Sequence, residues 1–225
     1  MNKISQNVAR IRHNIAEAAI KSGRKPEDIK LVGVTKYMDI ETMKILHAAG
    51  ITDFGESRVQ DFLPKREAFA SEPIDWHFIG HLQTNKVKSV VGNAKLIHSV
   101  DSVRLAEEIS RRAVLLDTTV DFLAEINIAD EDSKYGLKST ELSIFISTVS
   151  HLPRIKLRGL MCIAPFVENG EKNRPFFEKM RNLLIDTGLE KEHNTPQLSM
   201  GMSQDYVCAI SAGATIVRIG TSLIE

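Results

Sequence analysis

Short apolar runs alternate with helical patterns along the chain, and this alternation restricts the fold more than any other feature. Several runs are apolar nearly throughout, which is typical of strands buried on both faces of a parallel sheet. The runs lie at residues 31–34, 53–56, 74–80, 95–100, 120–128, 155–164, 197–202 and 215–220. About eight strands separated by helices predict a single (β/α)₈ barrel.

An open doubly wound sheet is the alternative architecture, but no glycine-rich phosphate turn follows the first strand, which disfavours it. No linker, repeat or change in composition divides the chain, so we expect one domain over residues 1–225.

A helix precedes the first strand and lies outside the repeating pattern. Its apolar face is formed by residues at spacings of three and four, namely Ile4, Val8, Ile11, Ile15 and Ala18. We expect this extra helix to pack on the outside of the barrel or to close one of its ends.

Three further signals concern the later helices. Pro64 should kink or restart the helix that contains it. Asp101 or Ser102 is expected to cap the helix after the fourth strand, and Ser139 the helix after the fifth.

The charge balance excludes several classes of partner. Lys+Arg and Asp+Glu each total 29, so the formal net charge is zero, and nothing favours nucleic acid or an anionic membrane as a partner. Two cysteines, Cys162 and Cys208, are too few for a disulfide framework, and no spacing resembles a zinc site. Residues 1–7 lack the apolar segment of a signal peptide, and no apolar run approaches the ~18 residues of a membrane span. We expect a cytoplasmic protein.

Lys36 follows the first apolar run directly, at the end where the functional groups of such barrels gather. The simpler interpretation is a surface lysine that begins a loop. The alternative is an amine held at the mouth of the barrel and partly desolvated, which could attack a carbonyl group and form a Schiff base.

Two late turns have the composition of a phosphate site. Such sites often form after the seventh and eighth strands, where Ser199-Met200-Gly201 and Gly220-Thr221-Ser222 lie. Glycine lets the backbone approach an anion, and free N–H groups and hydroxyls can bind it. Ordinary turn glycines remain the alternative.

Other polar residues lie at the predicted strand ends. Arg218 could be an ion-paired strand end or could face the ring of a bound cofactor. His77 fits a packing or supporting role better than a catalytic one, and Asn127 is a further candidate for cofactor contact. An amine, a phosphate site and an arginine together favour pyridoxal 5′-phosphate (PLP) as the ligand. A phosphosugar aldolase uses a similar set, although its Schiff-base lysine usually lies on a later strand.

Seven segments carry motifs that occur in one known family in the same order. They are residues 34–36 (VTK), 54–56 (FGE), 76–86 (WHFIGHLQTNK), 97–102 (IHSVDS), 159–161 (GLM), 198–203 (LSMGMS) and 217–220 (VRIG). The chain thereby resembles the YggS/PROSC family of PLP homeostasis proteins over nearly its whole length.

The resemblance implies a fold and a set of binding residues. The family fold is a single barrel similar to the N-terminal domain of alanine racemase. Lys36 would carry the cofactor as a Schiff base. Ser199 with Met200, and Gly220 with Thr221, match the positions that hold its phosphate.

The resemblance also gives Arg218 a role. It matches the arginine that faces the pyridine nitrogen and keeps it unprotonated, which makes the ring a weaker electron sink. Two departures from the family pattern stand out. Ser57 replaces the usual asparagine, and the sequence ends at residues 223–225 where relatives continue. We expect a looser last turn over the phosphate.

Carrier and enzyme differ in what they require. By the same resemblance, alanine racemase uses a tyrosine from an extra domain as a second acid/base, and Tyr37, Tyr135 and Tyr206 are not clearly placed for this role. We predict a PLP carrier in cofactor homeostasis, a monomer or weak dimer, with PLP-dependent apo-enzymes as candidate partners. A weakly active PLP-dependent amino-acid racemase and a cofactor-free phosphosugar-binding barrel are the alternatives.

Overall fold

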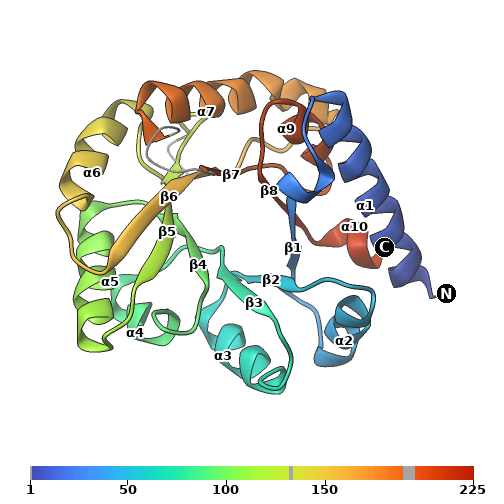
Figure 1. Ribbon diagram of the computed structural model, residues 1–225, viewed down its shortest axis with the longest axis horizontal. Coiled ribbons are helices and arrows are strands. Elements are labelled where there is room, and N and C mark those ends of the chain that lie inside the picture. The colour runs from blue at the N-terminus through green and yellow to red at the C-terminus, as the bar shows by residue number, and fades with distance from the viewer. Residues whose placement is uncertain (1, 132–133, 190–195) are drawn as a thin grey trace.

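The computed structural model describes residues 2–131, 134–189 and 196–225 and contains a closed barrel of parallel strands (Figure 1). Each strand pairs with the next in the sequence, and the last pairs with the first, which closes the barrel. The strands are β1 (Lys30–Val34), β2 (Asp53–Glu56), β3 (Asp75–Phe78), β4 (Leu96–Val100), β5 (Val120–Ile126), β6 (Ile155–Cys162), β7 (Gln197–Ser199) and β8 (Ile216–Ile219). The predicted (β/α)₈ barrel is confirmed.

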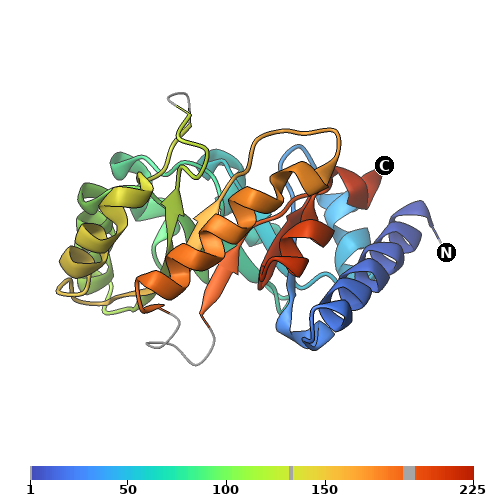
Figure 2. The ribbon, with the colours of Figure 1, turned by 90° about the horizontal axis from the view of Figure 1, so that it is seen from above.

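Helices connect the strands and lie on the outside of the barrel (Figure 2). They are α2 (Ile40–Ala48), α3 (Val59–Ala68), α4 (Val87–Val90), α5 (Val103–Leu115), α6 (Leu142–Val149), α7 (Arg174–Asp186), α9 (Tyr206–Ser211) and, after the last strand, α10 (Thr221–Ile224). Short 3₁₀ turns are η1 (Pro26–Asp28), η2 (Thr84–Lys86), η3 (Ser139–Glu141) and η4 (Gly170–Asn173). Helix α9 did not emerge from the sequence pattern.

Helix α1 (Lys3–Lys21) packs on the outside of the barrel, as one of the two expectations had it. It lies against α9 and α10, so both chain ends are on the same side of the molecule (Figure 1). Asn14 donates from Nδ2 to the hydroxyl of Tyr206 over 2.9 Å, and Asn7 donates to the carbonyl of Leu223 over 3.3 Å. The helix therefore holds the segments that flank the last strand.

Three expectations about helix ends have clear outcomes. Pro64 lies inside one helix, α3, which does not restart there. Ser102 caps α5 by accepting from the N–H of Leu105 over 3.4 Å. The expected cap at Ser139 is wrong, because Ser139 is the first residue of η3 and its hydroxyl has no partner in the described residues.

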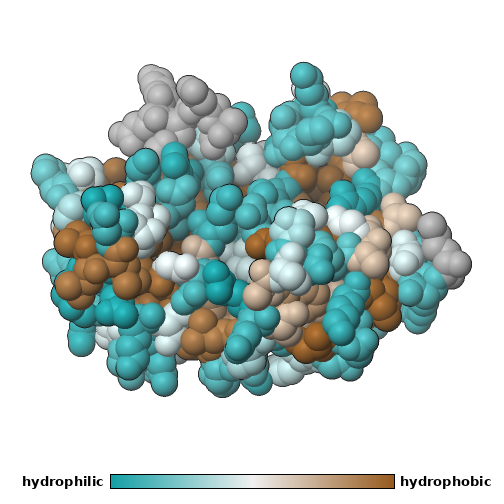
Figure 3. Space-filling model, turned by 60° about the horizontal axis from the view of Figure 1, so that its bottom comes forward, coloured by the Kyte–Doolittle hydropathy of each residue, from teal (hydrophilic) through white to brown (hydrophobic). Residues whose placement is uncertain are grey.

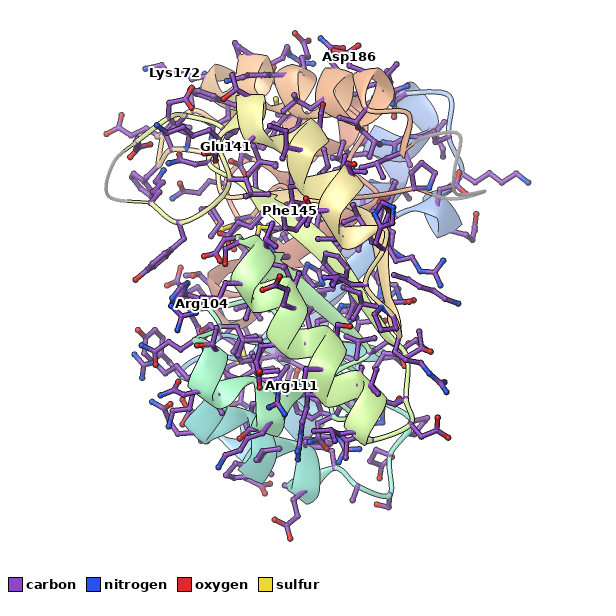
Figure 4. All side chains as sticks on the ribbon, turned by 90° about the vertical axis from the view of Figure 1, so that its left-hand side faces the viewer. Arg104, Arg111, Glu141, Phe145, Lys172 and Asp186 are labelled. Atoms are coloured by element: carbon purple, nitrogen blue, oxygen red, sulfur yellow. The ribbon has the colours of Figure 1, made fainter. Side chains whose placement is uncertain are left out.

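The apolar core has two parts. The larger part lies between the strands and the helices. Figure 4 shows α5 and α6 side by side. Phe145 of α6 packs edge-on against Phe122 of β5. A separate cluster inside the barrel joins five strands through Val32, Leu96, Leu123, Met161 and Ile216. Layers of this kind fill the interior of such barrels.

The surface carries apolar and hydrophilic patches side by side (Figure 3). Apolar residues that remain exposed include Ile144, Leu115 and Phe166. Within the described ranges, no helix combines the length and the apolar character needed to cross a bilayer.

Candidate functional site

Lys36 lies in a turn directly after β1, at the carboxyl end of the barrel. The N–H of Met38 donates to the carbonyl of Thr35 over 2.9 Å, and Tyr37 occupies the left-handed region with φ of 66°. The side chain of Lys36 is exposed. Of the two interpretations of Lys36, this exposure agrees with a surface lysine that begins a loop, because the turn carries the residue beyond the strand and away from the packed interior.

A buried ion pair fixes the backbone on which Lys36 stands. The ammonium of Lys65 on α3 lies 2.6 Å from Glu56 Oε2 and donates to the carbonyl of Thr35 over 2.8 Å. The hydroxyl of Thr35 also donates to Glu56 over 3.1 Å. Glu56 is fully buried at the end of β2, so its carboxylate depends on these partners. The position of Lys36 follows from this cluster.

Ser199 and Met200 have partners other than the phosphate expected from the sequence, which is a correction. Both residues are fully buried. The hydroxyl of Ser199 lies 2.6 Å from Arg218 Nη1 and 2.9 Å from His98 Nδ1, inside the barrel. The N–H of Met200 donates to the carbonyl of Ile216. Side chains alternate between the inside and the outside of the barrel along a strand, and Ser199 faces the inside, where His98 and Arg218 occupy its hydroxyl.

Ser203, which sequence reasoning did not single out, lies next to the turn that follows β8. Its hydroxyl accepts from the N–H of Ser222 over 3.4 Å, so the turns after β7 and β8 meet at these two residues. Among the described residues, no hydrogen bond engages the N–H groups of Gly201, Ser203 and Gly220. Ser203 belongs to the same LSMGMS motif as Ser199, and its place in the turn after the seventh strand was the available signal.

The glycine and threonine predicted at this site lie at the rim of the barrel. Gly220 is half-buried next to Val34, and Thr221 is exposed. Gly201 has φ of 91°, and a Cβ atom there would lie 2.6 Å from Cβ of Ala209. This turn requires glycine both for its conformation and for its space. Residues 221–224 form the short helix α10, in which Leu223 is buried.

Arg218 is buried with only 4% of its surface exposed. Its Nη1 and Nη2 donate to Ser199 and to the carbonyl of Cys162, over 2.6 and 2.8 Å. Burial lowers the pKa of the guanidinium, and the carboxyl of Glu125 opposes this effect. A guanidinium is a donor only, so any ligand group that faces Arg218 must be an acceptor.

Glu125 on β5 is a second residue that sequence reasoning missed. It is buried, and its Oε2 has no hydrogen-bond partner in the described part of the chain. Burial raises the pKa of this carboxyl to about 7, the negative charge of Asp101 adds to the rise, and Arg218 opposes it. An acidic residue within the apolar run 120–128 was the sequence signal.

The two remaining candidates serve the protein itself in this structure. His77 is buried, between Asp53 and His98, below the mouth. Asn127 uses its amide to hold the loop that follows β5. It donates to the carbonyls of Glu131 and Lys134 over 2.8 and 3.3 Å, and it accepts from the N–H of Glu131.

All three tyrosines lie outside the barrel interior, and each contacts another side chain. Tyr206 is bound to α1 through Asn14, and Tyr135 stacks on His81 with ring centroids 3.7 Å apart. Tyr37 is exposed and accepts a hydrogen bond from Arg58 over 3.1 Å.

Comparisons with known proteins agree with this fold. Residues 6–224 match the model of the alanine racemase N-terminal domain. The chain is 42% identical to a pyridoxal phosphate homeostasis protein of Aquifex aeolicus, covering 97% of this chain and 96% of the relative. It is 37% identical to the protein of that name in Escherichia coli K12, covering 99% and 96%. The PLP-bound structure of PipY from Synechococcus elongatus superposes with a TM-score of 0.85 at 29% identity, covering 99% and 100%.

Fold and site thus define a barrel of the alanine racemase N-terminal class. Within that class, the chain belongs to the YggS/PROSC family of pyridoxal phosphate homeostasis proteins.

Proposed function

We propose that this protein binds PLP at the carboxyl end of the barrel, through a Schiff base on Lys36, and takes part in PLP homeostasis as a holder of the cofactor rather than a turnover enzyme. The names of its relatives and the PLP bound to PipY support this proposal. Candidate recipients of the cofactor are PLP-dependent apo-enzymes.

One observation carries the proposal: an exposed amine and a set of unpaired anion-binding groups lie on neighbouring strand ends. Lys36 follows β1, which pairs with β8, and the N–H groups of Gly201, Ser203 and Gly220 follow β7 and β8. Unpaired N–H groups in glycine turns bind phosphate, and an accessible amine condenses with an aldehyde. PLP carries both chemical groups on one small ring.

The buried groups below the mouth fit the ring of PLP. When bound, the cofactor supplies an aldehyde, which forms an imine with a lysine by loss of water, and a ring that accepts electron density. Arg218 can donate to a ring nitrogen but cannot give up its own proton. The nitrogen opposite it would stay unprotonated, which weakens the ring as an electron sink and favours holding over turnover.

The positions of the tyrosines also support a holder. A racemase needs a second acid/base on the opposite face of the cofactor. Tyr206 is bound to α1, and Tyr37 and Tyr135 are both exposed and in contact with other side chains.

Absorbance spectroscopy with added PLP tests the proposal. We expect the wild type to develop the visible band of a protein-bound Schiff base, and Lys36→Ala to lose it entirely. Lys172→Ala, a change at an exposed lysine of η4, is the matched control and should keep the band. An unchanged band in Lys36→Ala would refute the covalent link.

A second candidate, a weakly active amino-acid racemase, draws on Glu125. Its carboxyl has a pKa of about 7 and an unpaired oxygen, so it could exchange protons at neutral pH. Loading the protein with PLP and incubating it with L-alanine in deuterium oxide distinguishes the two functions. Exchange at Cα that Glu125→Gln abolishes would favour the racemase, and the holder predicts no exchange.

A further inference from the structure

A chain of polar side chains crosses the interior of the barrel from β2 to β8. His77 Nε2 lies 3.0 Å from Asp53 Oδ1, and its Nδ1 lies 2.9 Å from His98 Nε2. His98 Nδ1 lies 2.9 Å from the Ser199 hydroxyl, which accepts from Arg218 over 2.6 Å. We call these five residues the interior relay. It passes from β4 directly to β7, across the barrel.

The two ends of the interior relay determine the direction of every hydrogen bond in it. Arg218 is only a donor, so the hydroxyl of Ser199 accepts from it, and among the described residues the acceptor in reach of the hydroxyl's own proton is His98 Nδ1. Ser199 therefore donates to His98. The ionised carboxylate of Asp53 is only an acceptor, so His77 must present Nε2–H to it. The contact between the rings is then satisfied by one arrangement, in which His98 Nε2–H donates to His77 Nδ1. Both histidines are neutral and carry their proton on Nε2.

The charges around the relay agree with neutral histidines. Burial lowers the pKa of His98 well below its ordinary value, and nearby positive charges, those of Arg218 and Lys30 among them, act in the same direction. Asp53 has a pKa lowered to about 2 against the opposing effect of burial, through its bonds to His77 and Lys30. The carboxyl groups that act on Arg218 from the other side are those of Glu125 and Asp205, and Asp101 in turn acts on Glu125.

Burying polar side chains in the barrel interior costs folding free energy. The interior of such a barrel is usually filled by branched apolar side chains, and a buried polar group without a partner is strongly unfavourable. The described relay atoms are all paired, and the last of them bind Arg218, whose other nitrogen is held by the carbonyl of Cys162. The relay therefore restricts the guanidinium to one orientation.

We propose that His98 and His77 are positioning residues for Arg218: as neutral Nε2–H tautomers they hold the Ser199 hydroxyl so that it accepts from the guanidinium. Where this affects a bound cofactor, it rests on the proposed function, because Arg218 would then face the ring. Neither histidine reaches the mouth of the barrel, so both act through Ser199.

Nitrogen-15 NMR of the cofactor-free protein tests the relay without PLP. In long-range imidazole correlation spectra at neutral pH, we expect both rings to be neutral and protonated on Nε2. His77→Gln keeps an N–H for Asp53 and an acceptor for His98, and should leave the His98 tautomer unchanged. His77→Leu removes both and should alter it. A charged His98 ring, or one protonated on Nδ1, in the wild type would overturn the assignment.

Titration with PLP tests the positioning role. We expect His98→Leu to weaken PLP binding on the order of tenfold and to shift its visible band, since an unpaired partner displaces the guanidinium. His13→Gln, at an exposed histidine of α1, is the control and should change neither. Unchanged affinity and band in a folded His98→Leu would overturn the role. A wild type that binds no PLP would instead refute the proposed function and leave the NMR result standing.

Discussion

The mouth of the barrel and its interior treat polar groups in opposite ways. At the mouth, Lys36 is exposed, and the N–H groups of Gly201, Ser203 and Gly220 have no partner among the described residues. In the interior, hydrogen bonds join the five residues of the relay in the order Asp53, His77, His98, Ser199 and Arg218. Among the described residues, the N–H groups at the rim of the barrel are thus unpaired, whereas the residues of the interior relay are paired with one another.

The same contrast separates two lysines that flank Thr35. Lys36 is exposed, whereas only 11% of the Lys65 side chain is exposed, and it is paired with Glu56. Two lysines next to the same residue thus have different surroundings, and substitutions should reveal the difference.

The largest expected effect is that of Lys65→Met. It leaves the carboxylate of Glu56 buried without its cation, and breaking such a pair costs about 3–5 kcal/mol of unfolding free energy. Urea denaturation followed by circular dichroism measures this loss. We also expect weaker PLP binding, because the carbonyl of Thr35 loses its donor and the turn that carries Lys36 loosens.

Lys44→Met is the matched control for Lys65→Met. Lys44 pairs with Glu41 on the exposed surface of α2, where such pairs contribute little. Equal denaturation midpoints for the two variants would contradict the distinction between supporting and exposed lysines.

The next effect concerns Glu125 and depends on pH. Its pKa is raised from 4.5 to about 7, so the unfolded chain ionises first and the folded state loses about 3 kcal/mol of stability between these values. We expect Glu125→Gln to gain stability relative to the wild type as the pH rises from 5 to 8. Denaturation curves at both pH values, with the same variant at Glu107 as an exposed control, test this.

His98 acts in the opposite direction. Its pKa lies well below the ordinary value of 6.5, so the unfolded chain takes up a proton first as the pH falls, and the folded state is then destabilised. His98→Gln should reduce the loss of stability seen on acidification from pH 7. The Glu125→Gln variant, in which His98 titrates without Glu125, should therefore lose stability between pH 7 and 5, and a flat profile there would contradict this.

The smallest effect, and the sharpest comparison, is between two serines of one motif. Ser199→Ala removes a buried link between His98 and Arg218 and should cost about 1–3 kcal/mol of unfolding free energy. Ser203→Ala should leave stability within about 0.5 kcal/mol and weaken PLP binding on the order of tenfold. Parallel denaturation and PLP titration of both variants measure the contrast, and the reverse pattern would exchange the roles that the structure gives them.

The barrel was predictable because its signal is repeated. Each buried strand adds a short apolar run, and the helix before β1 has a clear apolar face, so errors in single elements did not change the architecture. Helix α9 is only six residues long and is apolar nearly throughout, so its periodicity was too weak to identify it.

The details of the site were harder to predict because they depend on single positions. Strand β7 has three residues, and a shift of one residue decides whether Ser199 faces the interior of the barrel or the helices outside it. The partners in the interior relay lie 19 to 101 residues apart in sequence, so no local pattern connects them. The exposure of Lys36 depends on a turn in which Tyr37 has a positive φ, and a tyrosine does not predict that conformation.

Borohydride reduction of the PLP-loaded protein, followed by peptide mass spectrometry, tests the central claim most directly. Reduction makes the bond between cofactor and lysine permanent, so the modified residue can be identified. We predict that the label lies on Lys36 and that Lys65 and Lys172 carry none. A label on another lysine, or none at all after loading, would contradict the claim that the amine after β1 holds the cofactor.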